Sequence, residues 1–287
     1  MRILSIGNFG TGWDGSICDE EHIAAALEEL GHEVVRAQRD ELSLVSGDNR
    51  YDFTLLSQWD GYHDLDWLPR PLVYWAFDHQ AEGQEWHETL VANADLYLSK
   101  RIADSKYSNW VWCSQDFAPN FLTKAPEVEK DIDVLFTGSY LPWATERNEI
   151  MELVAGKYNL VIHSVNQWPQ GNEGPVMDDA LPELYARAKI VLSVDHTYEA
   201  GYWSDRNSQA IACGAFVLFR HVPLSEAIFR SNVAYFWGKE DVLDAIEHWL
   251  DRDEDRGVIA SEAYQMSEYY KVNMRVADML NIVKGIL

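Results

Sequence analysis

The sequence predicts an α/β fold made of two Rossmann-like domains, each with a parallel sheet covered by helices. Short apolar runs bounded by turn residues alternate with longer segments of helical periodicity along the chain, which is typical of parallel sheets with both faces covered. The alternation breaks once, in a charged, proline-containing stretch between residues 117 and 131, and then resumes. A chain of 287 residues is long enough for two domains of about 100–150 residues each.

The first part of the chain, residues 1–118, is expected to form the N-terminal domain. One helix is predicted near residues 17–30, with Gly31 as its end, and another near residues 83–93. Each separates apolar runs that read as buried strands. The strands of this domain are predicted at residues 2–6, 33–36, 53–57, 72–77 and 96–99.

The second part, residues 132–270, is expected to form a C-terminal domain that binds the ligand, and residues 271–287 a final helix. The same alternation of apolar runs and helical segments supports this division. Strands are predicted at residues 134–137, 160–163, 190–193 and 216–219, and helices near residues 144–156, 179–188, 204–213, 239–250 and 258–270.

The composition is that of a globular and strongly acidic protein. Apolar residues make up 47% of the chain and the formal net charge is −24. This charge argues against nucleic acid as a partner without excluding it, because nucleic-acid binding is driven mainly by cations that contact phosphates. The three cysteines have neither metal-binding nor disulfide spacing. With no signal peptide and no apolar run of ~20 residues, the sequence predicts a cytoplasmic protein without a membrane span.

The strongest local signal lies in residues 204–217, which read SDRNSQAIACGAFV. A polar opening leads into a helix of small residues that Gly214 ends, and an apolar strand follows. Ligands of α/β proteins bind outside the carboxyl ends of the strands, against helix N-termini. Asp205 opens this helix, and Arg206 and Gln209 share one face, where a phosphate and a ribose would be held. The alternative is a buried βα unit in which Gly214 is only a helix cap.

This segment resembles the (W)SDR-x-x-E-A-x-A-C-G-x-F-x-L stretch of spore-maturation-type glycosyltransferases, which are relatives of glycosyltransferase family four. The resemblance includes VLFTGS at residues 134–139 with Arg147, LPELYARAKIVL at residues 181–192, and continues to about residue 275. It implies the GT-B architecture, in which two Rossmann-like domains face a cleft and a last helix crosses back to the first domain. Gln209 departs from the family's Glu, which grips the donor ribose; an amide can still hydrogen-bond the ribose diol, without the charge.

The resemblance implies that the second domain binds a nucleotide-sugar donor, with a UDP- or GDP-sugar expected. The alternative for Arg147 is a surface side chain paired with Glu146 or Glu149. The family carries an acidic residue near Asp195 and Glu199, but the spacing here differs, so no role is transferred to either. The donor-binding residues that the resemblance implies are Gly138, Ser139, Arg147, Asp205, Arg206 and Gln209.

The first domain is expected to bind the acceptor. Gly10 and Gly12 lie in a glycine loop whose spacing is not that of a dinucleotide fingerprint; a tight turn is the alternative. Asp78 and His79 follow a predicted strand, where loops face the ligand crevice. They are the catalytic candidates, since a His there can act as a base or hydrogen-bond a sugar hydroxyl; a surface loop is the rival interpretation. His87 is expected to be exposed on a helix.

No metal site and no cofactor are predicted. Two D-x-D strings occur, at residues 64–66 and 131–133, but such strings arise readily by chance among 47 acidic residues. No His or Cys cluster has zinc spacing.

The leading interpretation is a metal-independent glycosyltransferase that moves a sugar from a nucleotide-sugar donor to a hydroxyl acceptor of unknown class. Similarity to family four suggests retention of the anomeric configuration, which the departure at Gln209 leaves open. Three alternatives remain: a non-catalytic nucleotide- or sugar-binding protein on a degenerate GT-B frame, a phage-type DNA-base glycosyltransferase, and a nucleotide-sugar epimerase.

Overall fold

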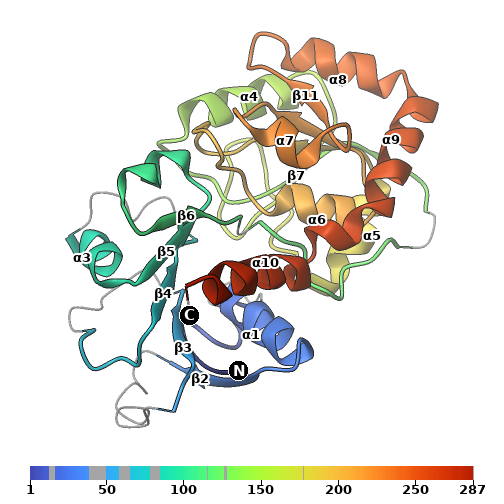
Figure 1. Ribbon diagram of the computed structural model, residues 1–287. Coiled ribbons are helices and arrows are strands. Elements are labelled where there is room, and N and C mark those ends of the chain that lie inside the picture. The colour runs from blue at the N-terminus through green and yellow to red at the C-terminus, as the bar shows by residue number, and fades with distance from the viewer. Residues whose placement is uncertain are drawn as a thin grey trace. The chain divides into compact units, whose positions relative to one another are not determined.

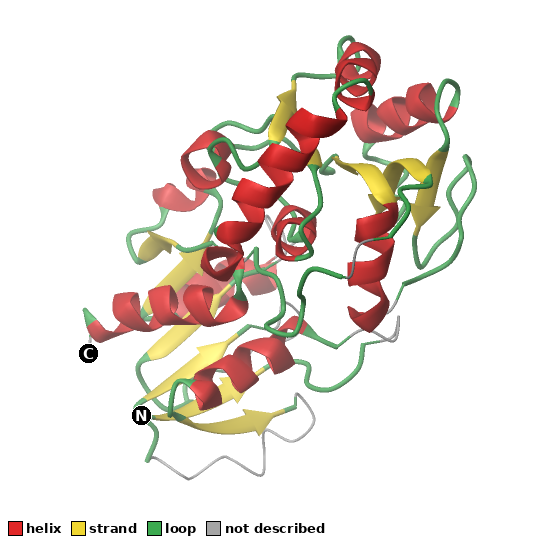
Figure 2. Ribbon diagram, turned by 90° about the vertical axis from the view of Figure 1, so that its right-hand side faces the viewer, coloured by secondary structure: helices red, strands yellow, loops and turns green. Residues whose placement is uncertain are grey.

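The computed structural model describes residues 1–12, 17–38, 50–57, 65–77, 85–114, 116–125, 128–176 and 178–286. The chain divides into two compact units. The first unit consists of residues 1–115 together with 272–287, and the second of residues 116–271. Each unit contains one parallel sheet with helices packed on it (Figures 1 and 2), so the α/β fold class predicted from the sequence is confirmed.

The sheet of the first unit has six parallel strands in the order β2-β1-β3-β4-β5-β6. Every residue of β3, β4 and β5 is buried, as expected for strands covered on both faces. Strand β6 lies at the edge and is partly exposed. The strands are β1 (Arg2–Ile6), β2 (Glu33–Ala37), β3 (Phe53–Leu56), β4 (Leu72–Trp75), β5 (Leu96–Ser99) and β6 (Trp110–Trp112).

The helices of the first unit come from both ends of the chain. Helix α1 (Asp19–Glu29) follows β1, and α3 (Glu85–Asn93) precedes β5, which is followed by a 3-10 turn, η3 (Ile102–Lys106). The last helix, α10 (Val272–Lys284), packs against α1 (Figure 1). The chain therefore ends in the unit in which it begins.

The sheet of the second unit has five parallel strands in the order β11-β10-β9-β7-β8. Strand β9 is central, and apolar side chains on the sheet pack with residues of α4 and α8 into one buried core. The strands are β7 (Ile132–Thr137), β8 (Leu160–His163), β9 (Ala188–Ser193), β10 (Val217–Arg220) and β11 (Ala234–Phe236). The helices are α4 (Thr145–Ala155), α5 (Leu181–Arg187), α6 (Arg206–Ala212), α7 (Ser225–Phe229), α8 (Val242–Leu250) and α9 (Asp253–Gln265), with 3-10 turns η4 (Asp178–Ala180) and η5 (Ser267–Tyr270).

Helix α6 ends as its sequence predicts. The backbone N–H of Ala215 donates to the carbonyl of Ala210 at 2.9 Å, and that of Gly214 donates to Ile211 at 2.9 Å. Gly214 has φ +73°, a left-handed conformation that glycine adopts at little cost and that closes helices in this hydrogen-bond pattern. The predicted end of the helix at Gly214 is confirmed.

The elements that depart from the prediction are short or shifted. Strands β6 and β11 and helix α7 were not predicted, because three to five residues carry too little periodicity to identify an element. Helix α9 begins five residues before the expected 258 and ends at Gln265, where η5 takes over. Its apolar pattern is weak, because the helix buries only Arg256 and Ala263.

Candidate functional site

The candidate site lies at the carboxyl edge of the second unit's sheet, where ligands of α/β proteins bind. Strand β7 leads into Gly138 and Ser139, and its neighbour β9 leads into Asp195. The backbone N–H of Gly138 donates to His163 at 3.0 Å, and its carbonyl accepts from the indole N–H of Trp168 at 2.9 Å. The turn after β7 is therefore held in place on both sides of its glycine.

Arg206, the first residue of α6, reaches back across this turn. Its Nε donates to the carbonyl of Thr137, the last residue of β7, and its guanidinium carbon lies 4.5 Å from the ring centre of Phe136. A Cβ placed on Gly138 would lie 2.5 Å from the guanidinium of Arg206. Gly138 also has φ +152°. The backbone conformation therefore favours glycine there, and a residue with a Cβ would have to displace the guanidinium of Arg206.

Arg147, in the first turn of α4, is a second buried cation at the same edge. Its side chain donates to the carbonyl of Ser139 at 2.6 Å, and only 4% of the residue is exposed. Burial, and then the charge of Arg206, lower the pKa of Arg147 to about 10. None of the described carboxylates forms an ion pair with it: Glu146 pairs with Arg220 and Glu149 with Lys239. The alternative of a surface arginine paired with its neighbours is wrong.

One carboxylate approaches the two arginines. Asp195 is buried, accepts from the backbone N–H of Ser204 at 3.1 Å, and lies 3.8 Å from Arg206. Its Oδ2 has no hydrogen-bond partner in the described part of the chain, and neither do Nε of Arg147 and the hydroxyl of Tyr198. Burial raises the pKa of Tyr198. Since buried polar atoms are normally hydrogen-bonded, these three atoms indicate that a ligand or water completes the site.

Asp205 and Gln209 lie one turn apart at the start of α6. The side-chain Nε2 of Gln209 donates to Oδ2 of Asp205 at 2.6 Å. The amide therefore orients the carboxylate. Asp205, Arg206 and Gln209 thus begin one helix that starts beside the turn after β7.

Of the candidate residues in the first unit, the structure describes Gly10 and Gly12. Gly10, with φ +89°, accepts through its carbonyl from the backbone N–H of Cys18 at 3.0 Å, and Gly12 lies in the same loop. Asp78 and His79 lie outside the described residues. The expectation that His87 is exposed is wrong: it is 2% exposed, and its Nδ1 hydrogen-bonds the hydroxyl of Tyr74 at 3.1 Å.

The described residues contain no group of three His, Cys, Asp or Glu side chains placed to hold a metal ion. In the D-x-D string that the structure describes, Asp131 pairs with Arg187 at 2.6 Å and Asp133 with Lys189 at 2.7 Å. These acids therefore serve as surface ion pairs. Among the described helices, none has the length and apolarity to cross a bilayer.

Comparison with known proteins identifies the family. A family model described as glycosyl transferase-like matches residues 121–281, which is more than half of the chain. The chain therefore belongs to this family. No curated protein sequence matches it.

Solved structures identify the fold. T4 phage BGT in complex with UDP and Mn²⁺ matches with a TM-score of 0.68 and 14% identity, over 100% of this chain and 99% of that one. Sucrose-phosphate synthase from Thermosynechococcus elongatus matches with a TM-score of 0.71 and 10% identity, over 100% and 99%. An alpha-glucosyltransferase in complex with UDP and a 13-mer DNA containing an HMU base matches with 0.66 and 12%, over 99% of each chain.

Family and fold together make this chain a GT-B glycosyltransferase, an enzyme that moves a sugar from a nucleotide-sugar donor to an acceptor. Sequence reasoning identified Gly138, Arg147 and Arg206, which the second unit brings together. It gave no role to Asp195 and did not single out Tyr198. Their position in the loop that follows the central strand β9 was the available signal.

Proposed function

We propose that this enzyme transfers a sugar from a UDP-sugar to a hydroxyl group, and that Arg147 and Arg206 hold the donor's diphosphate. The observation that carries the proposal is a pair of buried guanidinium groups with one carboxylate, Asp195, close to them. Two positive charges thus face a single nearby negative charge. The resulting repulsion from Arg206 helps to lower the pKa of Arg147. A bound diphosphate would supply the negative charge that the two arginines lack. As the sugar–phosphate bond breaks, negative charge builds up on the leaving diphosphate, and two fixed cations stabilise that charge in the transition state.

The choice of uridine rests on the similar structures. T4 phage BGT and the alpha-glucosyltransferase are both bound to UDP. The motif around Arg206 further supports a place among the spore-maturation-type relatives of family four. We also propose a cytoplasmic location, because the spacing of Cys18, Cys113 and Cys213 is not that of a disulfide framework, as expected in a reducing compartment.

In this proposal Gly138 and Ser139 let the diphosphate approach the backbone, and Asp205 with Gln209 binds the donor ribose. On the first unit, Gly10 and Gly12 contribute to acceptor binding, and Asp78 and His79 supply the catalytic base or orient the acceptor hydroxyl. These roles follow from the family resemblance and from the position of each residue after a strand.

Transfer is proposed to be independent of metal ions, because two arginines supply the charge that a divalent cation would otherwise provide. T4 phage BGT is found with Mn²⁺, so this point needs its own measurement. Turnover should persist in EDTA with unchanged kcat. A loss of turnover in EDTA that Mn²⁺ restores would contradict metal independence.

The proposal as a whole is tested by incubating the protein with UDP-glucose and a panel of hydroxyl acceptors and identifying the products by mass spectrometry. UDP should raise the melting temperature more than GDP, ADP or CMP at the same concentration, because a ligand that binds only the native state stabilises it. UDP release that requires an acceptor indicates a transferase. Binding without turnover would indicate a non-catalytic protein, and a new nucleotide sugar formed without acceptor would indicate an epimerase.

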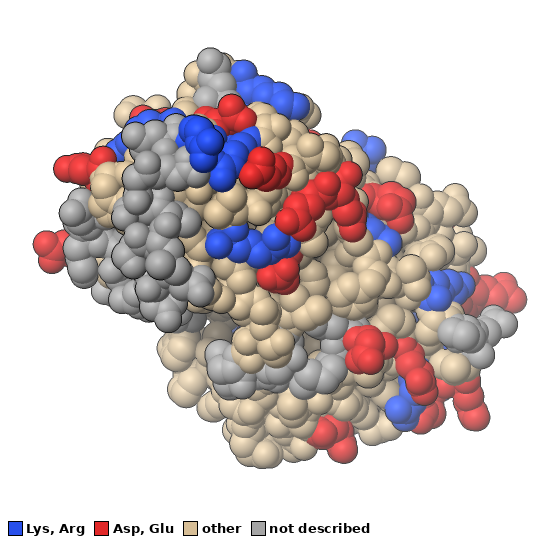
Figure 3. All heavy atoms as spheres, turned by 90° about the horizontal axis from the view of Figure 1, so that it is seen from below, with Lys and Arg blue, Asp and Glu red and all other residues tan. Residues whose placement is uncertain are grey.

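A modified DNA base is the second candidate acceptor. The observation that favours it is the similarity to an alpha-glucosyltransferase bound to DNA with an HMU base. The charge of −24 disfavours it, and on the face drawn in Figure 3 basic side chains lie beside acidic ones. Several of the first unit's arginines, including Arg2, Arg36 and Arg70, are in ion pairs. Transfer to a hydroxymethylated oligonucleotide at 150 mM salt would establish this acceptor.

Replacing Gln209 tests the ribose site. Gln209→Glu should raise the KM for the donor about tenfold, because a carboxylate would replace the amide that lies 2.6 Å from Asp205, and close like charges repel. Adding Asp205→Asn reverses the polarity of the hydrogen bond and should restore the KM in the double variant. Steady-state kinetics with UDP-glucose measure both. Higher turnover in Gln209→Glu alone would instead show that the native glutamine weakens the enzyme.

A further inference from the structure

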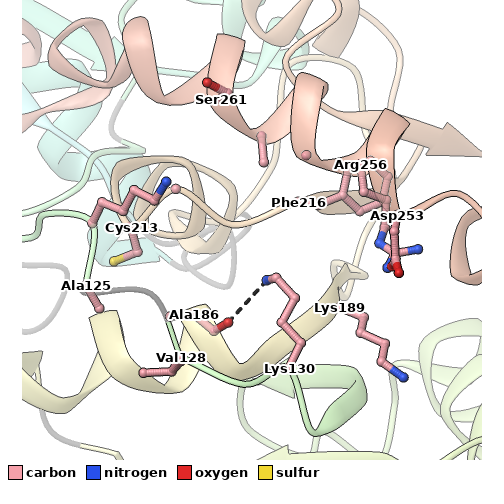
Figure 4. Close-up of a pocket in the computed structure, with 14 residues that line it drawn as sticks. Ala125, Val128, Lys130, Ala186, Lys189, Cys213, Phe216, Asp253, Arg256 and Ser261 are labelled. Carbon is pink, nitrogen blue, oxygen red and sulfur yellow. Dashed lines mark hydrogen bonds and ion pairs between the residues drawn. The ribbon is translucent and has the colours of Figure 1, made fainter.

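The second unit has a cavity of 510 Å³ at the edge of its sheet opposite the candidate donor site. Residues next to the amino ends of two strands line it: Lys189 is the second residue of β9, and Phe216 directly precedes β10. Helix α9 forms another wall through Arg256 and Gly257, and the segment containing Lys130 closes a further side (Figure 4). The cavity is therefore distinct from the edge where Gly138 and Asp195 lie.

The walls combine an apolar surface with a concentration of positive charge. In a chain with twice as many acidic as basic residues, the described residues that line the cavity include one acid, Asp253, and four cations. The apolar part consists mainly of Ala125, Val128, Ala186, Phe216 and Ala260, and the cations are Lys124, Lys130, Lys189 and Arg256.

Two of these cations are already balanced. Lys189 pairs with Asp133 at 2.7 Å, and Arg256 pairs with Asp253. Arg256 also donates to the carbonyl of Leu250, near the end of α8, at 3.0 Å. Both cations therefore form ion pairs with carboxylates of the same unit.

The other two cations, Lys124 and Lys130, form no ion pair with a described carboxylate. Lys130 donates to the carbonyls of Ala186 and Ala188 at 3.1 and 2.7 Å, which are neutral partners. No described carboxylate pairs with Lys130 or with Lys124. Partial burial lowers the pKa of Lys130, the charges of Arg256 and Lys124 lower it further, and the charge of Asp253 opposes them. An anion in the cavity would relieve this repulsion.

We propose that this cavity binds a small organic anion, with its apolar body against Phe216 and Val128 and its single carboxylate, sulfonate or phosphate group at Lys124 and Lys130. The volume lies within the range of ~300–1,000 Å³ of pockets that hold small molecules. The lining has the composition of such pockets, mostly apolar with a few polar groups that fix orientation. The inference does not depend on the proposed donor or acceptor.

Gly257 offers a way to fill the cavity without touching its cations. It lines the cavity from within α9, and a Cβ added there would meet nothing within 4 Å. A larger side chain is therefore expected to enter open space. Because glycine is also the poorer helix former by about 1 kcal/mol, Gly257→Leu should not reduce stability. Val258→Leu, at an exposed neighbouring position, is the matched control.

The test is a fluorescence titration of the full chain with 8-anilinonaphthalene-1-sulfonate, which joins an apolar body to one sulfonate. One molecule should bind per chain, at least tenfold more tightly than the uncharged N-phenyl-1-naphthylamine. Lys124→Met should weaken binding about tenfold, and Lys157→Met, at an ion pair outside the cavity, should not. Gly257→Leu should weaken binding at least tenfold, whereas Val258→Leu should leave it unchanged.

Three results would overturn the proposal. Equal affinity for the charged and uncharged probes would show that the cations do not contribute to binding. Full binding to Gly257→Leu, with an unchanged melting temperature, would place the probe elsewhere. Displacement of the probe by inorganic phosphate as effectively as by an organic anion would indicate a simple phosphate site. Saturating UDP should not displace the probe, which keeps this test separate from that of donor binding.

Discussion

Replacing Arg147 by methionine is expected to lower kcat/KM for the UDP-sugar about 10²–10³-fold while leaving the apo protein as stable as before or more stable. The loss of activity follows because removing one preorganised group that stabilises developing charge costs on the order of 3–4 kcal/mol in the transition state. The gain in stability follows because the fold buries this guanidinium without an ion-pair partner among the described residues. Burying an unpaired charge is costly.

The pKa of Arg147 gives the size and pH range of that cost. The fold lowers this pKa from 12.5 to about 10, so at pH 7 the folded state holds a cation that it disfavours, by on the order of 3 kcal/mol. The cost is fully present below the folded pKa and declines only as the pH rises through it. Part is offset by the hydrogen bond to Ser139. The free energy of unfolding of apo Arg147→Met, measured by urea denaturation at pH 7, should therefore be about 1–2 kcal/mol higher than that of the native protein.

Arg187→Met is the matched control for this prediction. Arg187 lies in the same unit, is exposed on the surface and pairs with Asp131 at 2.6 Å. Because exposed ion pairs contribute little, this variant should keep both activity and stability within experimental error. If Arg147→Met were instead destabilised and still bound UDP normally, the arginine would be a structural group and the proposed diphosphate site would be wrong.

The fold was predictable because its main elements carry their own local signals. Strands such as β4, with every residue buried, read as continuous apolar runs, and α6 ends at a glycine that closes it through backbone hydrogen bonds. These signals depend on a few neighbouring residues. The edge strands β6 and β11 were missed because each has only three residues, and so short an apolar run does not identify a strand.

The site was predictable in part, for a different reason. The sequence shows which residues follow a strand or begin a helix, and this identified Gly138 and Arg206. Whether a side chain is buried, and which charged group it pairs with, depends on contacts between elements that are distant in the sequence. The isolation of Arg147 from the carboxylates beside it in sequence, and the approach of Asp195 to Arg206, depend on how β7, β9 and α4 pack. The same holds for His87, whose ring is buried against Tyr74.

Gly138→Ala is expected to reduce kcat/KM for the donor about 10²-fold and the free energy of unfolding by about 1–3 kcal/mol. The stability loss follows from the backbone, because φ +152° is a conformation that residues with a Cβ adopt at a cost of that order. The loss of activity follows from contact: the new Cβ would lie 2.5 Å from the guanidinium of Arg206. That group must move, although its Nε is held by the carbonyl of Thr137.

Gly171→Ala separates these two effects. Gly171 lies in the same unit with φ +113°, but a Cβ there would meet nothing within 4 Å. This control should therefore show a comparable loss of stability in urea unfolding, with unchanged UDP affinity and kcat/KM. Calorimetric titration with UDP and steady-state kinetics measure the difference. If both variants lost donor binding equally, general destabilisation would explain the effect. If Gly138→Ala alone lost it, the placement of Arg206 beside the turn after β7 would be what donor binding requires.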